Sequence, residues 1–360
     1  MRNSTKAAAL AGVATLALMS AGTAAQAQQT INLSIGAGHT ESALWVQTIR
    51  DFFVPTVSAR VEAETDYTIN WTTGWGGTIC RLRECLDAIE VGLLDIADVA
   101  AVFEASRLQP YNFPFFVPFG SPDPRVTMRA IELVIEETPE LLEHLEQYNQ
   151  MYLGAGVLSD YGLLSAFEWD DPADLSGRRF AAAGPNVPWL EGSGIVPVSS
   201  NLNEAYTALQ TGVYDGRLQV PDAVVSFSLY EVARQWTIMN FNSATSALLT
   251  INRERFDSLP EEVQTIIVEV GAEWARHNAQ ATWEAQVAAF DGMRERGMVV
   301  KEASDELKAA WVARLDNLPA IRAAEIEANS NVPGDIVYRY FEAQRSLGHE
   351  FPRDWAAERE

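Results

Sequence analysis

The longest helical pattern in the chain is the feature that most restricts its fold. Apolar residues recur at helical spacing from Val263 to Phe290, and the pattern stops at Gly297. Ser258 is a candidate N-cap, and Pro260 suits the first turn of a helix. Such a helix would contain about 40 residues and measure about 55 to 60 Å. Because this exceeds the width of one small domain, we expect the helix to run across two lobes.

Strand-like and helical segments alternate in the part of the chain that precedes this helix. The first unit has strands near 31–35, 67–72 and 95–100, with helices near 44–53 and 83–92. The second unit has strand-like segments at 161–167, 179–183 and 213–220, with a helix near 203–210. This order favours an α/β fold with two mainly parallel sheets flanked by helices.

Each of these two units is predicted to form one lobe. Segments from the later part of the chain are expected to add to both lobes. We expect residues 28–155 and about 243–285 to form the first lobe, 156–242 and about 286–330 the second, and 331–360 a C-terminal helical tail.

The N-terminal segment has the pattern of a secretory signal. Arg2 and Lys6 precede an apolar run from Ala7 to Leu18, and small residues follow as far as Ala25-Gln26-Ala27. The apolar run has about 12 residues, whereas a membrane span needs about 20. We therefore predict a signal peptide at residues 1–27 that is cleaved after Ala27, and an exported, periplasmic protein that does not itself span the membrane.

The charge balance excludes one class of partner. The chain has 49 acidic and 26 basic residues, a formal net charge of −23. Loss of residues 1–27 removes two basic residues and no acidic ones, which makes the charge −25. Because nucleic acid is bound through clustered cations, it is not an expected partner.

The two cysteines, Cys80 and Cys85, lie five positions apart at the predicted start of a helix. Residues with this spacing do not share a helical face, but a disulfide is possible if Cys80 lies in the preceding turn. The alternatives are two small buried side chains or a metal site. No histidine lies near the pair, so we expect a disulfide and no metal.

Sequence motifs of enzymes are absent. The chain has no G-x-S-x-G, H-E-x-x-H, P-loop or G-x-G-x-x-G motif, and its four histidines are far apart in sequence. We therefore predict a protein that is not an enzyme and needs no cofactor.

Four stretches together resemble the solute-binding proteins of TRAP (tripartite ATP-independent periplasmic) transporters, of the C4-dicarboxylate-binding type. They are Glu90-Val-Gly-Leu-Leu-Asp-Ile-Ala, Asp174-Leu-Ser-Gly-Arg-Arg-Phe, Tyr206-Thr-Ala-Leu-Gln-Thr-Gly-Val-Tyr-Asp-Gly and Leu259-Pro-Glu-Glu-Val-Gln. The resemblance implies a type II-like periplasmic binding protein, in which two lobes close on a small organic solute. It also implies delivery of that solute to a small and a large membrane permease subunit. The alternatives are an ABC-type periplasmic binding protein and, from another class, a secreted hydrolase.

The resemblance further implies an arginine that pairs with the ligand carboxylate, in the strand after the D-L-x-G motif. Here that position is Ala181. Arg179 has the same strand parity and is the candidate substitute, although it would lie about 6.6 Å deeper along the strand. An organic acid gripped by other groups is therefore expected, and a neutral, zwitterionic or aromatic solute is the alternative.

Other ligand-binding candidates lie in loops that leave strand ends, where open α/β sheets bind ligands. Each of them has core packing or a structural hydrogen bond as its alternative role. These candidates are His39, Trp45, Trp75, Gly77, Thr78, Asn186, Trp189, Arg217 and Gln219.

Overall fold

The structure is a computed structural model that describes residues 28–359. The predicted signal peptide, residues 1–27, lies outside the described residues. None of the helices in the described part of the chain is both long enough and apolar enough to cross a membrane.

The first sheet contains five strands in the order β2-β1-β3-β10-β4. β1 (Gln29–Ala37) pairs in parallel with β2 (Tyr67–Gly74) and with β3 (Ile96–Val99). β10 (Thr245–Asn252) pairs antiparallel with β3 and with β4 (Gln150–Val157). The helices in this part of the chain are α1 (Leu44–Thr48), η1 (Ile49–Phe53), α2 (Val54–Glu64), α3 (Cys85–Glu90), η2 (Ala101–Phe103), η3 (Gln109–Phe116), α4 (Pro124–Glu137) and α5 (Pro139–Glu146).

The second sheet contains six strands in the order β11-β9-β5-β8-β6-β7. Its strands are β5 (Gly162–Ser165), β6 (Arg179–Ala182), β7 (Val196–Ser199), β8 (Gly216–Gln219), β9 (Gln235–Ile238) and β11 (Val299–Glu302). β6 is parallel to β7 and β8, and β9 is parallel to β11, whereas β5 is antiparallel to β8 and β9. The intervening helices are η4 (Pro172–Leu175), η5 (Gly184–Leu190), α6 (Ala205–Gln210), α7 (Pro221–Ser226) and η6 (Leu229–Glu231).

Both sheets are mainly parallel, as expected, but each contains one strand that runs against the others: β10 in the first sheet and β5 in the second. The reason is the path of the chain between them. β5 enters the second sheet from β4, and β10 enters the first sheet from β9. Each entering strand runs away from the opposite sheet, so it is antiparallel to neighbours that run toward that sheet. The predicted residue ranges of the two lobes stay a prediction.

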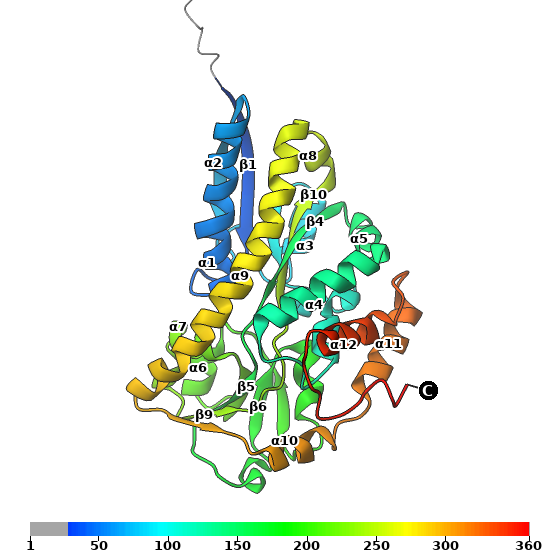
Figure 1. The fold of residues 1–360 in the computed structure, drawn as a ribbon. Helices are drawn as coiled ribbons and strands as arrows, with labels where there is room; N and C mark the ends of the chain where they lie inside the picture. Colours follow the sequence, from blue (N-terminus) through cyan, green and yellow to red (C-terminus); the bar gives the residue numbers. More distant parts are fainter. Residues whose placement is uncertain (1–27, 360) are drawn as a thin grey trace, which may run out of the picture.

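The long helix is confirmed as α9 (Glu261–Glu295), which has 35 residues and measures about 53 Å. It passes from the end of the molecule that carries α2 and α8 (Arg253–Asp257) to the end that carries α7 and β9 (Figure 1). The predicted N-cap was wrong: Ser258 ends α8, where its hydroxyl donates to the Arg255 carbonyl, and the N-cap of α9 is Pro260. After α9 come β11, α10 (Asp305–Val312), α11 (Leu318–Asn329) and α12 (Ile336–Ser346).

Gly271 sets how closely α9 approaches β4. A Cβ atom added there would lie 2.4 Å from the Leu153 carbonyl oxygen. We expect Gly271→Ala to lower the free energy of unfolding by about 1 to 3 kcal/mol, because the helix must move off the sheet. Gly292→Ala is the matched control in the same helix, where an added Cβ meets only side-chain atoms at 3.3 Å or more. It should be neutral or stabilising, and equal urea midpoints for the two variants would contradict this account.

Two turns of the same kind position β3 in the first sheet and β8 in the second: each has a helix-ending glycine followed three residues later by an aspartate. A glycine in the left-handed region, Gly92 or Gly212, ends the preceding helix. Three residues later, the Asp95 carboxylate accepts the Ser34 backbone N–H at 2.6 Å, and the Asp215 carboxylate accepts that of Arg179 at 2.8 Å. Each aspartate therefore ties the start of its strand to the neighbouring parallel strand.

Candidate functional site

Two adjoining cavities lie where strands of the two sheets end. The inner cavity has a volume of about 50 Å³, and the outer cavity has a volume of about 590 Å³. Phe103 and Asn201 line both of them. Because Phe103 follows β3 and Asn201 follows β7, the boundary between the cavities is built from both sheets.

The inner cavity receives side chains from both sheets and is mostly apolar and aromatic. His39 and Trp45 follow β1, and their rings make an edge contact with centroids 5.0 Å apart. Tyr161 immediately precedes β5 and is 7% exposed. The remaining lining residues are Val102, Phe103, Phe115, Leu158, Ala183, Asn201, Leu202, Arg217, Leu218, Gln219, Val220, Thr245 and Ser246.

Arg217 on β8 is a buried cation in this cavity, with only 4% of its surface exposed. One guanidinium nitrogen donates to the Tyr214 hydroxyl at 3.2 Å and to the Asn201 carbonyl at 3.4 Å. Among the described residues, none of its hydrogen-bond partners is a carboxylate. Burial lowers the pKa of Arg217, but a guanidinium keeps its proton in proteins. The inner cavity therefore contains a positive charge without a counter-ion from the described chain.

The position of Arg217 is related to that of Ala181. The two residues are register partners across the parallel strands β6 and β8, so their side chains project from the same face of the sheet. Ala181 is fully buried and extends no further than its Cβ. The resemblance implies an arginine at position 181, where this chain has an alanine. The neighbouring strand β8 carries Arg217 at the register position next to Ala181.

Further buried polar atoms of the lining residues have no hydrogen-bond partner within residues 28–359. They are Trp45 Nε1, Gln219 Nε2, His39 Nδ1 and Ser246 Oγ. The Gln219 amide oxygen accepts the Val220 N–H at 2.9 Å, which leaves the amide nitrogen free to donate. Burial lowers the pKa of His39 to about 4, so its ring is neutral at pH 7. The inner cavity thus combines one cation with several neutral hydrogen-bonding groups.

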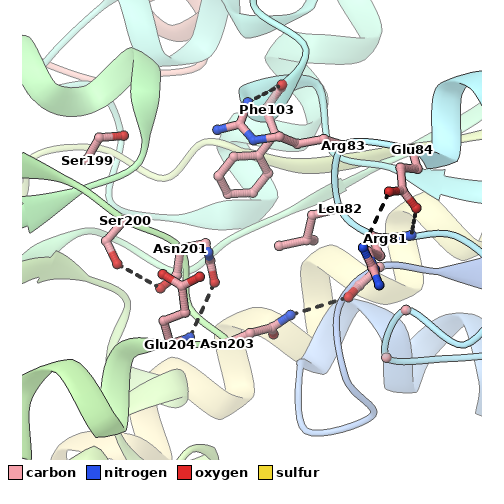
Figure 2. A pocket seen from close by; sticks show the side chains of 13 residues that line it. Arg81, Leu82, Arg83, Glu84, Phe103, Ser199, Ser200, Asn201, Asn203 and Glu204 are labelled. Atoms are coloured by element: carbon pink, nitrogen blue, oxygen red, sulfur yellow. Dashed lines mark hydrogen bonds and ion pairs between the residues drawn. The ribbon is translucent and has the colours of Figure 1, made fainter.

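The outer cavity has one wall on each side of the gap between the sheets. The first wall is the loop between Cys80 and Cys85, which are joined by a disulfide as predicted. The second wall is the segment 199–204, which follows β7. Figure 2 shows the side chains of the two walls on opposite sides of an open space. The Asn203 amide reaches across it to the Gly38 carbonyl at 3.4 Å.

The structure brings about half of the predicted ligand-binding residues to these cavities. His39, Trp45, Arg217 and Gln219 line the inner cavity, and Gly77 lines the outer one.

The other predicted residues line neither cavity. Trp189 is fully buried behind the inner cavity, where its indole N–H donates to the Phe115 carbonyl at 2.9 Å. Asn186 is fully buried nearby in η5, and its side-chain amide has no hydrogen-bond partner among the residues that the structure describes. Trp75 is half-buried against the core, and the exposed Thr78 donates to the Trp75 carbonyl.

Arg179, the candidate substitute for an arginine at position 181, lies away from both cavities. It begins β6, whereas both cavities lie at the opposite end of the strand. Its side chain is 48% exposed and donates to the Gly212 carbonyl at 2.8 Å, with the Asp215 carboxylate 3.8 Å away. The position of Arg179 in the strand thus holds its guanidinium at the outer surface.

Several lining residues were missed from the sequence. Arg81 and Arg83 lie between the two cysteines, and this pairing of cations with a short disulfide loop was the available signal. Thr245 and Ser246 are two consecutive hydroxyl residues at the start of β10, directly before the apolar run Ala247-Leu248-Leu249. No local signal marks Phe103 or Leu158. No cluster of metal-ligating side chains occurs within residues 28–359.

Comparison with known proteins gives a family match over most of the described chain. Residues 56–324 match the family model described as bacterial extracellular solute-binding protein, family 7 (DctP). The ectoine-binding periplasmic protein TeaA of Halomonas elongata is 24% identical over 276 residues, which cover 72% of this chain and 74% of TeaA. The C4-dicarboxylate-binding periplasmic protein DctP of Rhodobacter capsulatus is 30% identical over 143 residues, 39% of this chain and 43% of that protein. The chain spans only 40 to 43% of the length of the first curated relatives it matches.

Solved structures share the fold over nearly their whole length. DctP7 of Bordetella pertussis, an extracytoplasmic solute receptor binding pyroglutamic acid, has a TM-score of 0.70 at 19% identity and covers 88% of this chain and 99% of its own. A TRAP solute-binding protein of Citrobacter koseri with bound D-glucuronate has a TM-score of 0.71 at 17% identity and covers 87% and 99%. These likenesses agree with the two mixed sheets and the long helix, and with the family match they show that the chain belongs to family 7 of the bacterial extracellular solute-binding proteins, the DctP family of TRAP solute-binding proteins.

Proposed function

We propose that this chain is the extracytoplasmic receptor of a TRAP transporter and captures a small organic acid with one carboxylate. The observation that carries this proposal is Arg217, a buried cation without a counter-ion in the cavity between the two sheets. Burying a charge without a partner is costly, and a charged hydrogen-bond partner offsets that cost. A ligand carboxylate is such a partner, and a guanidinium binds it in a bidentate arrangement.

The charge of the inner cavity favours one carboxylate over two. Arg217 is the one charged residue of its lining, because His39 is neutral at pH 7. A second carboxylate would be desolvated there without a cation to pair with. The neutral groups on Trp45, Gln219 and Ser246 suit hydroxyl, carbonyl or amide groups near the acid.

The solutes of the related receptors support this class. Pyroglutamate and glucuronate, which are named for two of the structural neighbours, each carry a single carboxylate. Relatives named for ectoine and for C4-dicarboxylates show that solutes vary within the family, so the choice for this chain rests on its own cavity.

Capture is expected to occur by closure of two lobes, one around each sheet. His39 and Trp45 follow a strand of the first sheet, while Arg217 and Gln219 lie on β8 of the second. A solute that contacts both sets has more contacts in the closed state and therefore shifts the population toward it. The closed complex would then deliver the solute to the small and large permease subunits from the periplasm, after cleavage of the signal peptide at residues 1–27.

Native mass spectrometry of protein purified without denaturation tests this function. We expect one bound organic acid per chain, which is lost on denaturation and raises the melting temperature of the emptied protein when it is added back. Turnover of that acid by the protein, or a bound compound without an acid group, would contradict the proposal.

A further inference from the structure

The inner cavity is too small to enclose a whole sugar acid. A buried water needs about 10 to 15 Å³ of cavity volume measured in this way, so about 50 Å³ holds the equivalent of about four waters. That is enough for a carboxylate and the atoms next to it. The rest of a longer acid would have to pass the boundary formed by Phe103 and Asn201, beyond which lies the outer cavity of about 590 Å³.

The loop that forms one wall of the outer cavity is held in place at several points. The disulfide closes it between Cys80 and Cys85. Its backbone packs directly on Gly38, where an added Cβ would lie 2.5 Å from the Leu82 nitrogen. Arg83 donates to the Phe103 carbonyl at 2.9 Å, and its guanidinium carbon lies 5.3 Å from the centre of the Phe103 ring. A wall fixed in this way loses little entropy when it binds a ligand.

The charged side chains of the outer cavity balance each other. Arg81 and Arg83 contribute two cations, and Glu84 and Glu204 contribute two carboxylates. The closest approach between the Arg81 guanidinium and the Glu84 carboxylate is 3.9 Å, and the only acceptor that Arg83 contacts within the described residues is the Phe103 carbonyl. The walls thus present donors and acceptors without net charge. This suits hydroxyl or amide groups better than a hydrocarbon tail or a second carboxylate.

We propose that the outer cavity is a second subsite, in which Arg83 of the disulfide-closed loop and Glu204 of the opposite wall bind the hydrogen-bonding tail of an acid whose carboxylate lies at Arg217. The inference rests on the proposed function, because it takes the position of the carboxylate from it. The solute is then an elongated monocarboxylate with hydroxyl or amide groups along its chain.

The test is a titration of wild type and of Arg83→Ala with three monocarboxylates that share the acid group. Glycolate has no tail, D-gluconate has a hydroxylated tail, and hexanoate has an apolar tail of the same carbon number. We expect wild type to bind gluconate at least about tenfold more tightly than the other two acids, which corresponds to about 1.4 kcal/mol. Arg83→Ala should remove this advantage and leave glycolate binding unchanged. Glu204→Ala, on the opposite wall, should also reduce it, and Arg129→Ala on the surface of α4 is the control.

The outcomes separate this inference from the proposed function. If glycolate binds wild type as tightly as gluconate does, or if Arg83→Ala weakens all three acids equally, the second subsite is overturned and the carboxylate site at Arg217 stands. If none of the three acids binds wild type at millimolar concentration, the second subsite is overturned, and the proposed function is decided separately by whether native mass spectrometry finds a bound organic acid.

Discussion

Arg217→Gln is expected to weaken binding of a monocarboxylate such as pyroglutamate by about 10²-fold to 10³-fold, measured as Kd by isothermal titration calorimetry. Losing one partner of a buried, hydrogen-bonded ion pair costs about 2 to 5 kcal/mol. The stability of the ligand-free protein should not fall, because the variant removes a buried charge that lacks a counter-ion. Loss of binding without loss of stability is the result that distinguishes a ligand contact from a structural residue.

Two further variants control for this prediction. Arg179→Gln removes an exposed arginine that lines neither cavity and should leave Kd unchanged. The double variant Ala181→Arg with Arg217→Ala moves the guanidinium to the register partner on β6. It should recover at least about tenfold of the affinity that Arg217→Ala loses. If Arg179→Gln were the variant that abolishes binding, or if Arg217→Gln bound normally, the assignment of the carboxylate site would be wrong.

Asp98→Asn is expected to stabilise the protein at pH 8 by about 2 to 4 kcal/mol. Asp98 lies on β3, is 2% exposed, and neither of its carboxylate oxygens has a hydrogen-bond partner in the described part of the chain. Across the first sheet, Asp98 is the register partner of Ala37 on β1 and of Leu249 on β10. Leu249 is in turn the register partner of Gly154 on β4, where an added Cβ would contact α9. Burial raises the pKa of Asp98 to about 7.

The size of the stabilisation by Asp98→Asn depends on pH. Between about pH 4 and pH 7, folded Asp98 keeps a proton that the unfolded chain has released, so its contribution to stability falls as pH rises through this window. The penalty is complete above pH 7 and absent below pH 4. The advantage of Asp98→Asn in urea unfolding should therefore be large at pH 8 and should shrink toward zero near pH 4. Asp316→Asn, at an exposed aspartate, should show no such trend, and a pH-independent advantage for Asp98→Asn would contradict this explanation.

Local patterns were sufficient to predict β1, β2, β3, β5, β6, β8 and the long helix, whereas β4, β7, β9, β10 and β11 were not predicted. The buried face of α9 is apolar at helical spacing from Val263 to Ala275, which is enough to predict a helix from local sequence; further along, Asn278, Thr282 and Gln286 occupy the same buried face. The disulfide and the helices between the early strands follow from short-range spacing in the same way. The antiparallel strand in the first sheet could not be predicted from local patterns, because β10 lies about 90 or more residues further along the chain than its neighbours β3 and β4.

The candidate site was only partly predictable for a related reason. His39 and Gln219 follow from the rule that ligands bind at strand ends. The pairing of Ala181 with Arg217 depends on the register between two strands that are separate in sequence, so it was not visible that Arg217 lies beside position 181. Arg179 has the correct strand parity but the wrong depth, and its distance from the cavities depends on where β6 begins.

A calorimetric titration with two sets of matched solutes tests the central claim most directly. The first set is D-glucose, D-glucuronate and D-glucarate, with no, one and two carboxylates on the same carbon chain. The second is L-pyroglutamate with its neutral amide. We predict that the protein binds the monocarboxylate of at least one set, and binds the other members of that set at least about tenfold more weakly, because the inner cavity offers one cation at Arg217. Binding of the neutral or the two-carboxylate solute as tight as that of the matched monocarboxylate would contradict the account.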